Sequence, residues 1–219
     1  MEIIADKITF GGKSLGKLTT TSNTDNSSGK NIFIPYAIPG ETYEIELTDS
    51  KRDYDEGKIT KIIKSSPHRV TPPCPYYGKC GGCNMMHIDC DYQRTLRKDI
   101  LFDIFNQNKI DLTEKINIVH GPDFNYRARF QLNNGGLSEK NSNNIVPITE
   151  CLCAEKPIND YLSNVSFEQR TKGRIHLFGS DYVIHNGQGN SKLAISFEND
   201  KDKNAKKIIG KGSTKNLKT

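Results

Sequence analysis

The chain is organised around one cysteine-rich stretch, Cys74-Pro75-Tyr76-Tyr77-Gly78-Lys79-Cys80-Gly81-Gly82-Cys83-Asn84-Met85-Met86-His87. Its three cysteines follow a C-x5-C-x2-C pattern, with two glycines between the last pair. Cysteines spaced closely around glycine let a chain bend back and bring several thiolates to one small centre. A fourth ligand must come from elsewhere in the chain, and the candidates are Cys151 and Cys153.

The spacing predicts a bound metal but does not identify it, because zinc and iron–sulfur clusters both accept four cysteine ligands. His87 follows Cys83 by four residues and is an alternative ligand of the kind found in zinc sites with three cysteines and one histidine. A structural role is favoured for His87, since a distant cysteine can complete an all-thiolate set. Cys90 is interpreted as a small buried thiol.

Composition favours a cytoplasmic protein. The first residues show no signal peptide, and no run of about 18 apolar residues is present. In a reducing compartment, six cysteines favour metal ligation over disulfides. The net charge of +5 comes from residues 201–219, which carry seven lysines and one aspartate, so the other residues sum to −1. Any affinity for nucleic acid must therefore come from local patches.

The first part of the chain is expected to be a small barrel. Residues 1–66 contain about five short strand-like stretches separated by turn signals, which is typical of a closed barrel of the OB type. Residues 42–47 show the strict alternation of a half-buried strand. Residues 67–90, rich in proline and cysteine, are expected to be an extended segment that holds the metal.

The second part is expected to contain one amphipathic helix and a small α+β domain, so the predicted fold class is mainly β, or α+β. Within residues 91–120, a helix is predicted over residues 91–108, with an apolar stripe of Leu96, Ile100, Leu101, Ile104 and Phe105. Residues 121–197 alternate strands and turns around a short helical stretch at residues 150–162. The lysine-rich residues 198–219 are expected to be a disordered tail.

A basic and aromatic run, Tyr126-Arg127-Ala128-Arg129-Phe130, is the main candidate for RNA binding. It is expected to place both arginines on one strand face and the aromatic rings on the other, combining phosphate contacts with stacking on bases. The alternative interpretation is a strand whose arginines face solvent without binding RNA, because such a strand has the same sequence pattern. Lys61 and Arg69 add positive charge before the cysteines, and nearby acidic residues partly offset that charge. The candidate RNA-binding residues are therefore Tyr126, Arg127, Arg129, Arg69 and Lys61.

Taken together, these features resemble the RNA (uracil-5-)methyltransferases that carry an N-terminal TRAM domain and a cysteine-ligated cluster. The matching residues run in order along the chain: Gly11-Gly12, Ile32-Phe33-Ile34-Pro35, Ile38-Pro39-Gly40-Glu41, Pro67, Arg69, Pro73-Cys74-Pro75, Cys80-Gly81-Gly82-Cys83, His87, Gln93, Tyr126-Arg127-Ala128-Arg129, and Cys151 with Pro157-Ile158-Asn159. The family pattern has a tyrosine where this chain has Cys90.

The resemblance implies a [4Fe–4S] cluster held by Cys74, Cys80, Cys83 and Cys151. It prefers Cys151 to Cys153 because the family's cysteine precedes a Pro-Ile-Asn-like run at this distance. It also implies that a TRAM barrel and a central domain bind RNA, either rRNA or tRNA.

The catalytic part of that family is not recognisable in this sequence. Uracil-5 methylation needs a thiolate that adds to C6, a methyl donor beside C5, and a base that removes the C5 proton. The sequence has no glycine-rich loop between a strand and a helix, no Asp-Pro-Pro motif and no cysteine after Cys153. We therefore expect a truncated chain that has no catalytic residues, does not bind S-adenosylmethionine, and is inactive alone.

Two consequences remain open at this point. The helix stripe from Leu96 to Phe105 would be exposed without its family partner, so we expect it to bind a separate methyltransferase chain or to belong to a degenerate remnant. The alternative function is a zinc-stabilised protein-interaction module without an RNA role.

Overall fold

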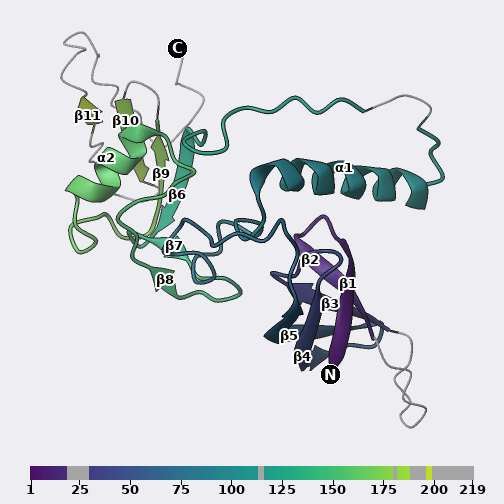
Figure 1. The fold of residues 1–219 in the computed structure, drawn as a ribbon. Coiled ribbons are helices and arrows are strands. Elements are labelled where there is room, and N and C mark those ends of the chain that lie inside the picture. The colour runs from purple at the N-terminus through teal and green to yellow at the C-terminus, as the bar shows by residue number, and fades with distance from the viewer. Residues whose placement is uncertain (19–29, 113–115, 180–181, 188–195, 199–219) are drawn as a thin grey trace. The chain divides into compact units, whose positions relative to one another are not determined.

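The computed structural model describes residues 1–18, 30–112, 116–179, 182–187 and 196–198 (Figure 1). Strands predominate in these ranges and are accompanied by two α-helices. The chain divides into two compact units, Met1–Pro73 with Cys83–Val119, and Cys74–Gly82 with His120–Thr219. The predicted class, mainly β with α+β character, is confirmed, whereas the predicted domain boundaries stay predictions.

The first unit is built on a closed five-stranded barrel (Figure 1). The barrel order is β1-β2-β3-β5-β4, and the β3–β5 pair is its parallel pair. Side chains of β1 alternate between buried and exposed, the two-residue period of a strand with one face in a core. The five-stranded barrel predicted from the sequence is confirmed, with β1 (Glu2–Ile8), β2 (Lys13–Leu18), β3 (Asn31–Pro35), β4 (Thr42–Ser50) and β5 (Tyr54–Lys64).

The interior of the barrel is narrow. A Cβ atom at Gly16 would lie 2.6 Å from Cδ1 of Ile34, and one at Gly57 would lie 2.8 Å from Cδ1 of Ile45. Glycine at these two strand positions therefore gives isoleucine the room to fill the interior. The buried residues of this core are Ile3, Ala5, Ile32, Ile34, Ala37, Tyr43 and Ile45.

Helix α1 (Cys90–Gln107) belongs to the same unit and lies within one residue of its predicted bounds. Asp89 caps its first turn by accepting a hydrogen bond of 2.8 Å from the Tyr92 N–H. Leu96 is 2% exposed and packs with Ile8, Ile38 and Ile88 in a second core cluster.

The prediction that the whole stripe of α1 is uncovered is wrong. Leu96 is buried, Ile100 packs against the same cluster, and Asp103 forms an ion pair of 2.7 Å with Lys7 of β1. Positions 96, 100 and 103 form one face, because residues three and four apart are neighbours on a helix. Phe105 is half-buried, and Leu101 and Ile104 stay 37% and 39% exposed.

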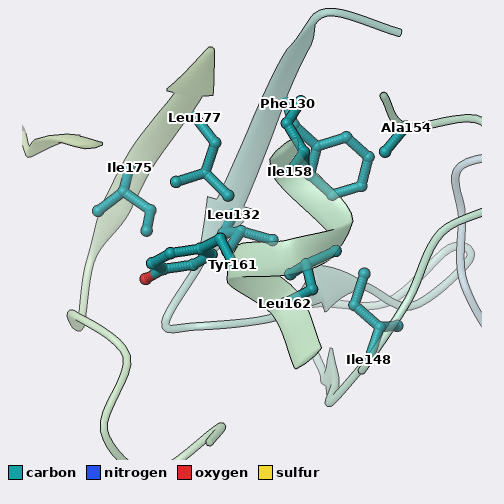
Figure 2. Packing of buried hydrophobic residues seen from close by; sticks show 9 residues of the cluster. All are labelled: Phe130, Leu132, Ile148, Ala154, Ile158, Tyr161, Leu162, Ile175 and Leu177. Carbon is teal, nitrogen blue, oxygen red and sulfur yellow. The ribbon is translucent and has the colours of Figure 1, made fainter. Parts of the chain in front are cut away.

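The second unit contains a four-stranded antiparallel sheet of order β11-β10-β9-β6, with α2 packed on one face (Figures 1 and 2). Phe130, Leu132, Ile175 and Leu177 pack on side chains of α2. Strands β9 and β10 pair antiparallel in it. Its elements are β6 (Arg129–Asn133), β7 (Leu137–Ser138), β8 (Ile145–Val146), α2 (Lys156–Asn164), β9 (Arg174–Phe178), β10 (Tyr182–Gly187) and β11 (Ser196–Glu198).

Arg170 closes the end of α2. Its side chain is buried and donates to the carbonyl oxygens of Leu162 (2.6 Å), Val165 (2.9 Å) and Gly135 (2.8 Å). A buried cation at a helix C-terminus satisfies carbonyl groups that have no partner within the helix. Burial lowers the pKa of the Arg170 guanidinium.

Two further expectations concern the ends of the chain and membranes. The predicted lysine-rich tail lies outside the described residues from residue 199 onward. Neither helix in the described part of the chain combines the length and apolar character needed to cross a membrane.

Candidate functional site

The segment Cys74–Gly82 forms tight turns within the second unit. The Tyr77 N–H donates to the Cys74 carbonyl at 3.1 Å, and the Cys80 N–H donates to the Tyr76 carbonyl at 2.9 Å. The Gly82 N–H points at the Cys80 sulfur, 3.4 Å away. A backbone N–H directed at a sulfur favours the thiolate, the form that binds metals.

Tyr76 fastens this segment to the chain that carries the other cysteines. Its hydroxyl lies 2.9 Å from Thr149 Oγ1 and accepts a hydrogen bond of 3.1 Å from the Thr149 N–H. Thr149 lies two residues before Cys151. The structure therefore places Cys74 and Cys80 in the same unit as Cys151 and Cys153, as a fourth ligand from that region requires.

Asn159 of α2 holds the turn that carries Cys151. Its Oδ1 accepts from the Cys151 N–H at 2.8 Å, and its Nδ2 donates to the carbonyls of Cys151 (3.0 Å) and Ala154 (3.1 Å). The Pro-Ile-Asn run therefore has a physical role, because its asparagine orders the cysteine turn.

The thiols of this unit influence one another. Burial is the largest cause that raises the pKa of Cys80, and Cys74 and Cys153 raise it further, whereas the Gly82 N–H and Arg127 act in the opposite direction. The hydrogen bond with the Cys153 side chain, followed by burial, raises the pKa of the Cys151 thiol. Without a metal, these neighbouring groups favour neutral thiols, whereas a metal cation would stabilise the thiolates.

The structure does not gather a complete metal site. Among the described residues, no three His, Cys, Asp or Glu side chains are grouped closely enough to hold a metal ion. Cys83 belongs to the first unit, with a half-buried side chain. His87 lies in that unit too, 2% exposed and edge-on to the Tyr36 ring at 5.9 Å. Half-buried thiols are donors that zinc and iron–sulfur clusters both accept, so the side chains fit either group chemically.

Arg69, predicted to bind RNA, has an internal role in the barrel unit. Its Nε and Nη2 donate to the two oxygens of Glu41 at 2.8 and 2.6 Å, and Nη2 also donates to the Tyr36 carbonyl and the Tyr43 hydroxyl. The Glu41 side chain is fully buried. This bidentate pair commits two of the three guanidinium nitrogens to the protein, and RNA binding by Arg69 stays a prediction.

Lys61 lies on the exposed surface of β5. The register pairs Lys61 with Glu44 and Lys58 with Glu46 across the β4–β5 ladder. Opposite charges that face each other across two strands attract. This surface therefore alternates in charge, which weakens the case for a basic patch on this part of the barrel.

The two arginines of the predicted RNA run lie near different aromatic rings. Arg127 precedes β6, and its guanidinium lies 5.5 Å from the centre of the buried Phe130 ring. Arg129 is the first residue of β6, with its guanidinium 5.8 Å from the ring of Phe178. Tyr126 is 55% exposed. Each guanidinium therefore lies near an aromatic ring, and the expectation of one arginine face and one aromatic face stays a prediction.

The exposed face of β6 and β9 carries functional candidates that the sequence analysis missed. Arg129 pairs with Phe178, Gln131 with His176, and Asn133 with Arg174. The alternation in residues 174–178 was visible in the sequence, but only the register places these side chains beside Arg129.

Comparison with known proteins gives these features a context. No protein-family profile matches the chain. An uncharacterised RNA methyltransferase of Treponema denticola is 35% identical over 206 residues, 85% of this chain and 49% of the relative. The 23S rRNA (uracil(1939)-C(5))-methyltransferase RlmD of Shewanella amazonensis is 34% identical over 161 residues, 68% of this chain and 36% of that protein. The chain thus spans about half or less of the length of these relatives.

A solved structure agrees in fold. The tRNA (uracil-54, C5)-methyltransferase of Pyrococcus abyssi, in complex with S-adenosyl-L-homocysteine, aligns with a TM-score of 0.54 and 19% identity, over 86% of this chain and 46% of the other. At that identity the likeness concerns the fold alone. From the sequence matches, the homologues of this chain are RNA (uracil-5-)methyltransferases such as RlmD.

Proposed function

We propose that this chain is the RNA-binding, iron–sulfur-containing part of an RNA (uracil-5-)methyltransferase, and that it acts in the cytoplasm on rRNA or tRNA. The observation that carries the proposal is the 34% identity to RlmD, a 23S rRNA uracil-5-methyltransferase, over 161 residues, or 68% of this chain. In this proposal the five-stranded barrel is a TRAM domain.

The proposed cluster is a [4Fe–4S] centre with Cys74, Cys80, Cys83 and Cys151 as ligands. When bound, it supplies a structural cross-link between distant parts of the chain. The supporting contacts are those of Tyr76 with Thr149 and of Asn159 with the Cys151 backbone. They order both cysteine segments of the second unit without a metal.

Catalysis needs a domain that binds S-adenosylmethionine, for which these residues offer no motif. Leu101 and Ile104 belong to the apolar stripe of α1 that was predicted to bind a methyltransferase chain, and both stay exposed. We propose that this remnant of the stripe contacts the methyltransferase domain.

Metal content tests the cluster. The chain is purified without oxygen, and iron, sulfide and zinc are measured per polypeptide. We expect about four irons and a brown protein. Cys151→Ser should lose most of the iron, whereas Cys153→Ser and the matched control Cys90→Ser should retain it. One zinc and no iron would favour the zinc-stabilised alternative.

A binding measurement tests the proposed RNA-binding role. Affinity for a structured rRNA fragment is measured from low to moderate salt, and we expect it to fall steeply as salt rises, because phosphate contacts release counterions. Absence of binding at low salt would remove the RNA role and leave the protein-interaction alternative.

A further inference from the structure

The face of the β6–β9 pair that points away from α2 has a distinctive set of side chains. Three come from each strand: Arg129, Gln131 and Asn133 from β6, and Arg174, His176 and Phe178 from β9. Their neighbours Phe130, Leu132, Ile175 and Leu177 are fully buried in the core, so alternation turns these six outward. Each of the six is exposed or half-exposed. We call them the outer face.

Planar groups are stacked or in edge contact along the outer face. The Arg129 guanidinium lies over the Phe178 ring at 5.8 Å, and the His176 ring meets Phe178 edge-on at 6.4 Å. His176 Nε2 lies 3.1 Å from Gln131 Oε1. The pairwise contacts orient a guanidinium, a ring, an imidazole and an amide before any ligand arrives.

The outer face is electropositive. Burial is the first cause that lowers the pKa of His176, and the charges of Arg129 and Arg174 lower it further. None of the six outer-face side chains is acidic. A neutral imidazole between two guanidinium groups offers hydrogen bonds to a base while the arginines attract phosphate.

We propose that the outer face is a binding platform for unpaired RNA. The planar groups of Arg129, His176 and Phe178 contact bases by stacking or through a ring edge, and Arg174 contacts phosphate. This inference rests on the proposed RNA-binding function and goes beyond it by naming the surface and the strandedness of its ligand. A protein partner fits less well, since the outer face lacks the large apolar centre that most protein interfaces bury.

Strandedness follows from the geometry. Bases within a duplex are stacked on one another, so side-chain planes reach them only when the bases are unpaired. Positive charge beside planar side chains on an open sheet is the combination that single-stranded nucleic acids bind. A double helix would contact only the positive charges of the outer face, through its phosphates.

The test compares RNA forms and variants by fluorescence anisotropy. The probes are a labelled unpaired RNA of about 10 nucleotides, within the range that small β domains cover, and a fully paired duplex of the same length. The variants are Arg174→Gln and Phe178→Leu, which remove one charge and one ring. The matched control is Arg97→Gln, an exposed arginine of α1.

We expect wild type to prefer the unpaired probe, and each outer-face variant to weaken that binding about tenfold. Arg174→Gln should also lower the salt slope by about 0.7, the value for one phosphate contact on a single strand. Arg97→Gln should stay within twofold of wild type. Circular dichroism checks that the variants fold.

A second readout uses wild type alone. The His176 ring resonances should shift when unpaired RNA is added, and the ring signals of His68 should not. Variant affinities within twofold of wild type, or unshifted His176 signals, would overturn the outer-face proposal while leaving the RNA-binding function intact if wild type still binds. Failure of wild type to bind any RNA would reject both.

Discussion

Replacement of Arg69 by methionine should destabilise the barrel unit far more than it affects RNA contacts. Arg69 forms two hydrogen bonds with Glu41, whose side chain is fully buried, and contacts Tyr43 and the Tyr36 carbonyl as well. Methionine preserves much of the aliphatic volume but leaves the Glu41 carboxylate without its cation.

The magnitude follows from burial. Removing one partner of a buried ion pair costs roughly 3–5 kcal/mol, because the remaining charge stays desolvated. The Ser66 N–H (2.8 Å) and the Tyr43 hydroxyl still donate to Glu41, and the Arg69 side chain is 19% exposed. We therefore expect the lower end, about 3 kcal/mol, which is roughly a 150-fold change in the unfolding equilibrium constant.

The assay is urea unfolding followed by circular dichroism, together with amide exchange. A loss of about 3 kcal/mol lowers the midpoint by about 1–3 M urea for typical slopes. Because the chain has two compact units that can unfold separately, a local probe is also needed. The Ile38 N–H donates to Tyr43 at 2.8 Å and should exchange faster in the variant.

Two controls decide the interpretation. Arg97→Met removes an exposed arginine of α1 and should change stability by less than about 0.5 kcal/mol. Adding Glu41→Gln to Arg69→Met removes the unpaired charge and should restore part of the stability. If Arg69→Met unfolds like wild type while RNA affinity falls, the internal role of Arg69 is refuted and the predicted RNA contact is favoured.

Two other predictions follow from single side chains. Arg170→Met should lower stability by about 3 kcal/mol, since two buried carbonyls and one partly buried carbonyl lose a charged donor. Thermal unfolding measures this, and an unchanged midpoint would contradict it. Asp89→Ala should cost about 1 kcal/mol through loss of the α1 cap. The Tyr92 N–H and, to a lesser degree, His68 lower the pKa of Asp89 in the folded protein. The contribution of Asp89 to stability is therefore complete above the usual aspartate pKa and is lost as pH falls through the lower folded value. Acid unfolding of wild type and Asp89→Ala, compared with Asp99→Ala, checks this.

The helical and strand periods were sufficient to predict the barrel strands and α1, whereas α2 (Lys156–Asn164) is displaced from the predicted helical stretch at residues 150–162. Alternation over residues 42–47 and the turn signals around it gave the barrel strands, and the apolar spacing in residues 91–108 gave α1 to within a residue. These patterns are local, because each depends on residues a few positions apart. Cysteine spacing is local too, so the candidates Cys74, Cys80 and Cys83 needed no structure.

Partners that lie far apart in the chain needed the tertiary structure. The same periodicity on α1 allows two overlapping apolar faces, and only packing on Ile8 and Ile38 selects the face of Leu96 over that of Leu101. A positive charge in the sequence does not say whether it faces solvent or a buried carboxylate.

The sequence by itself determined the kinds of element, the order of the cysteines and the resemblance to RNA uracil-5-methyltransferases. The tertiary structure decided that Arg69 pairs with Glu41, that Asn159 holds the Cys151 turn, and that Arg129 meets Phe178 across two strands. The physical reason is that hydrogen bonds and stacking depend on which distant segments a compact core brings together. Register between β6 and β9, 45 residues apart at Gln131 and His176, is set by that core.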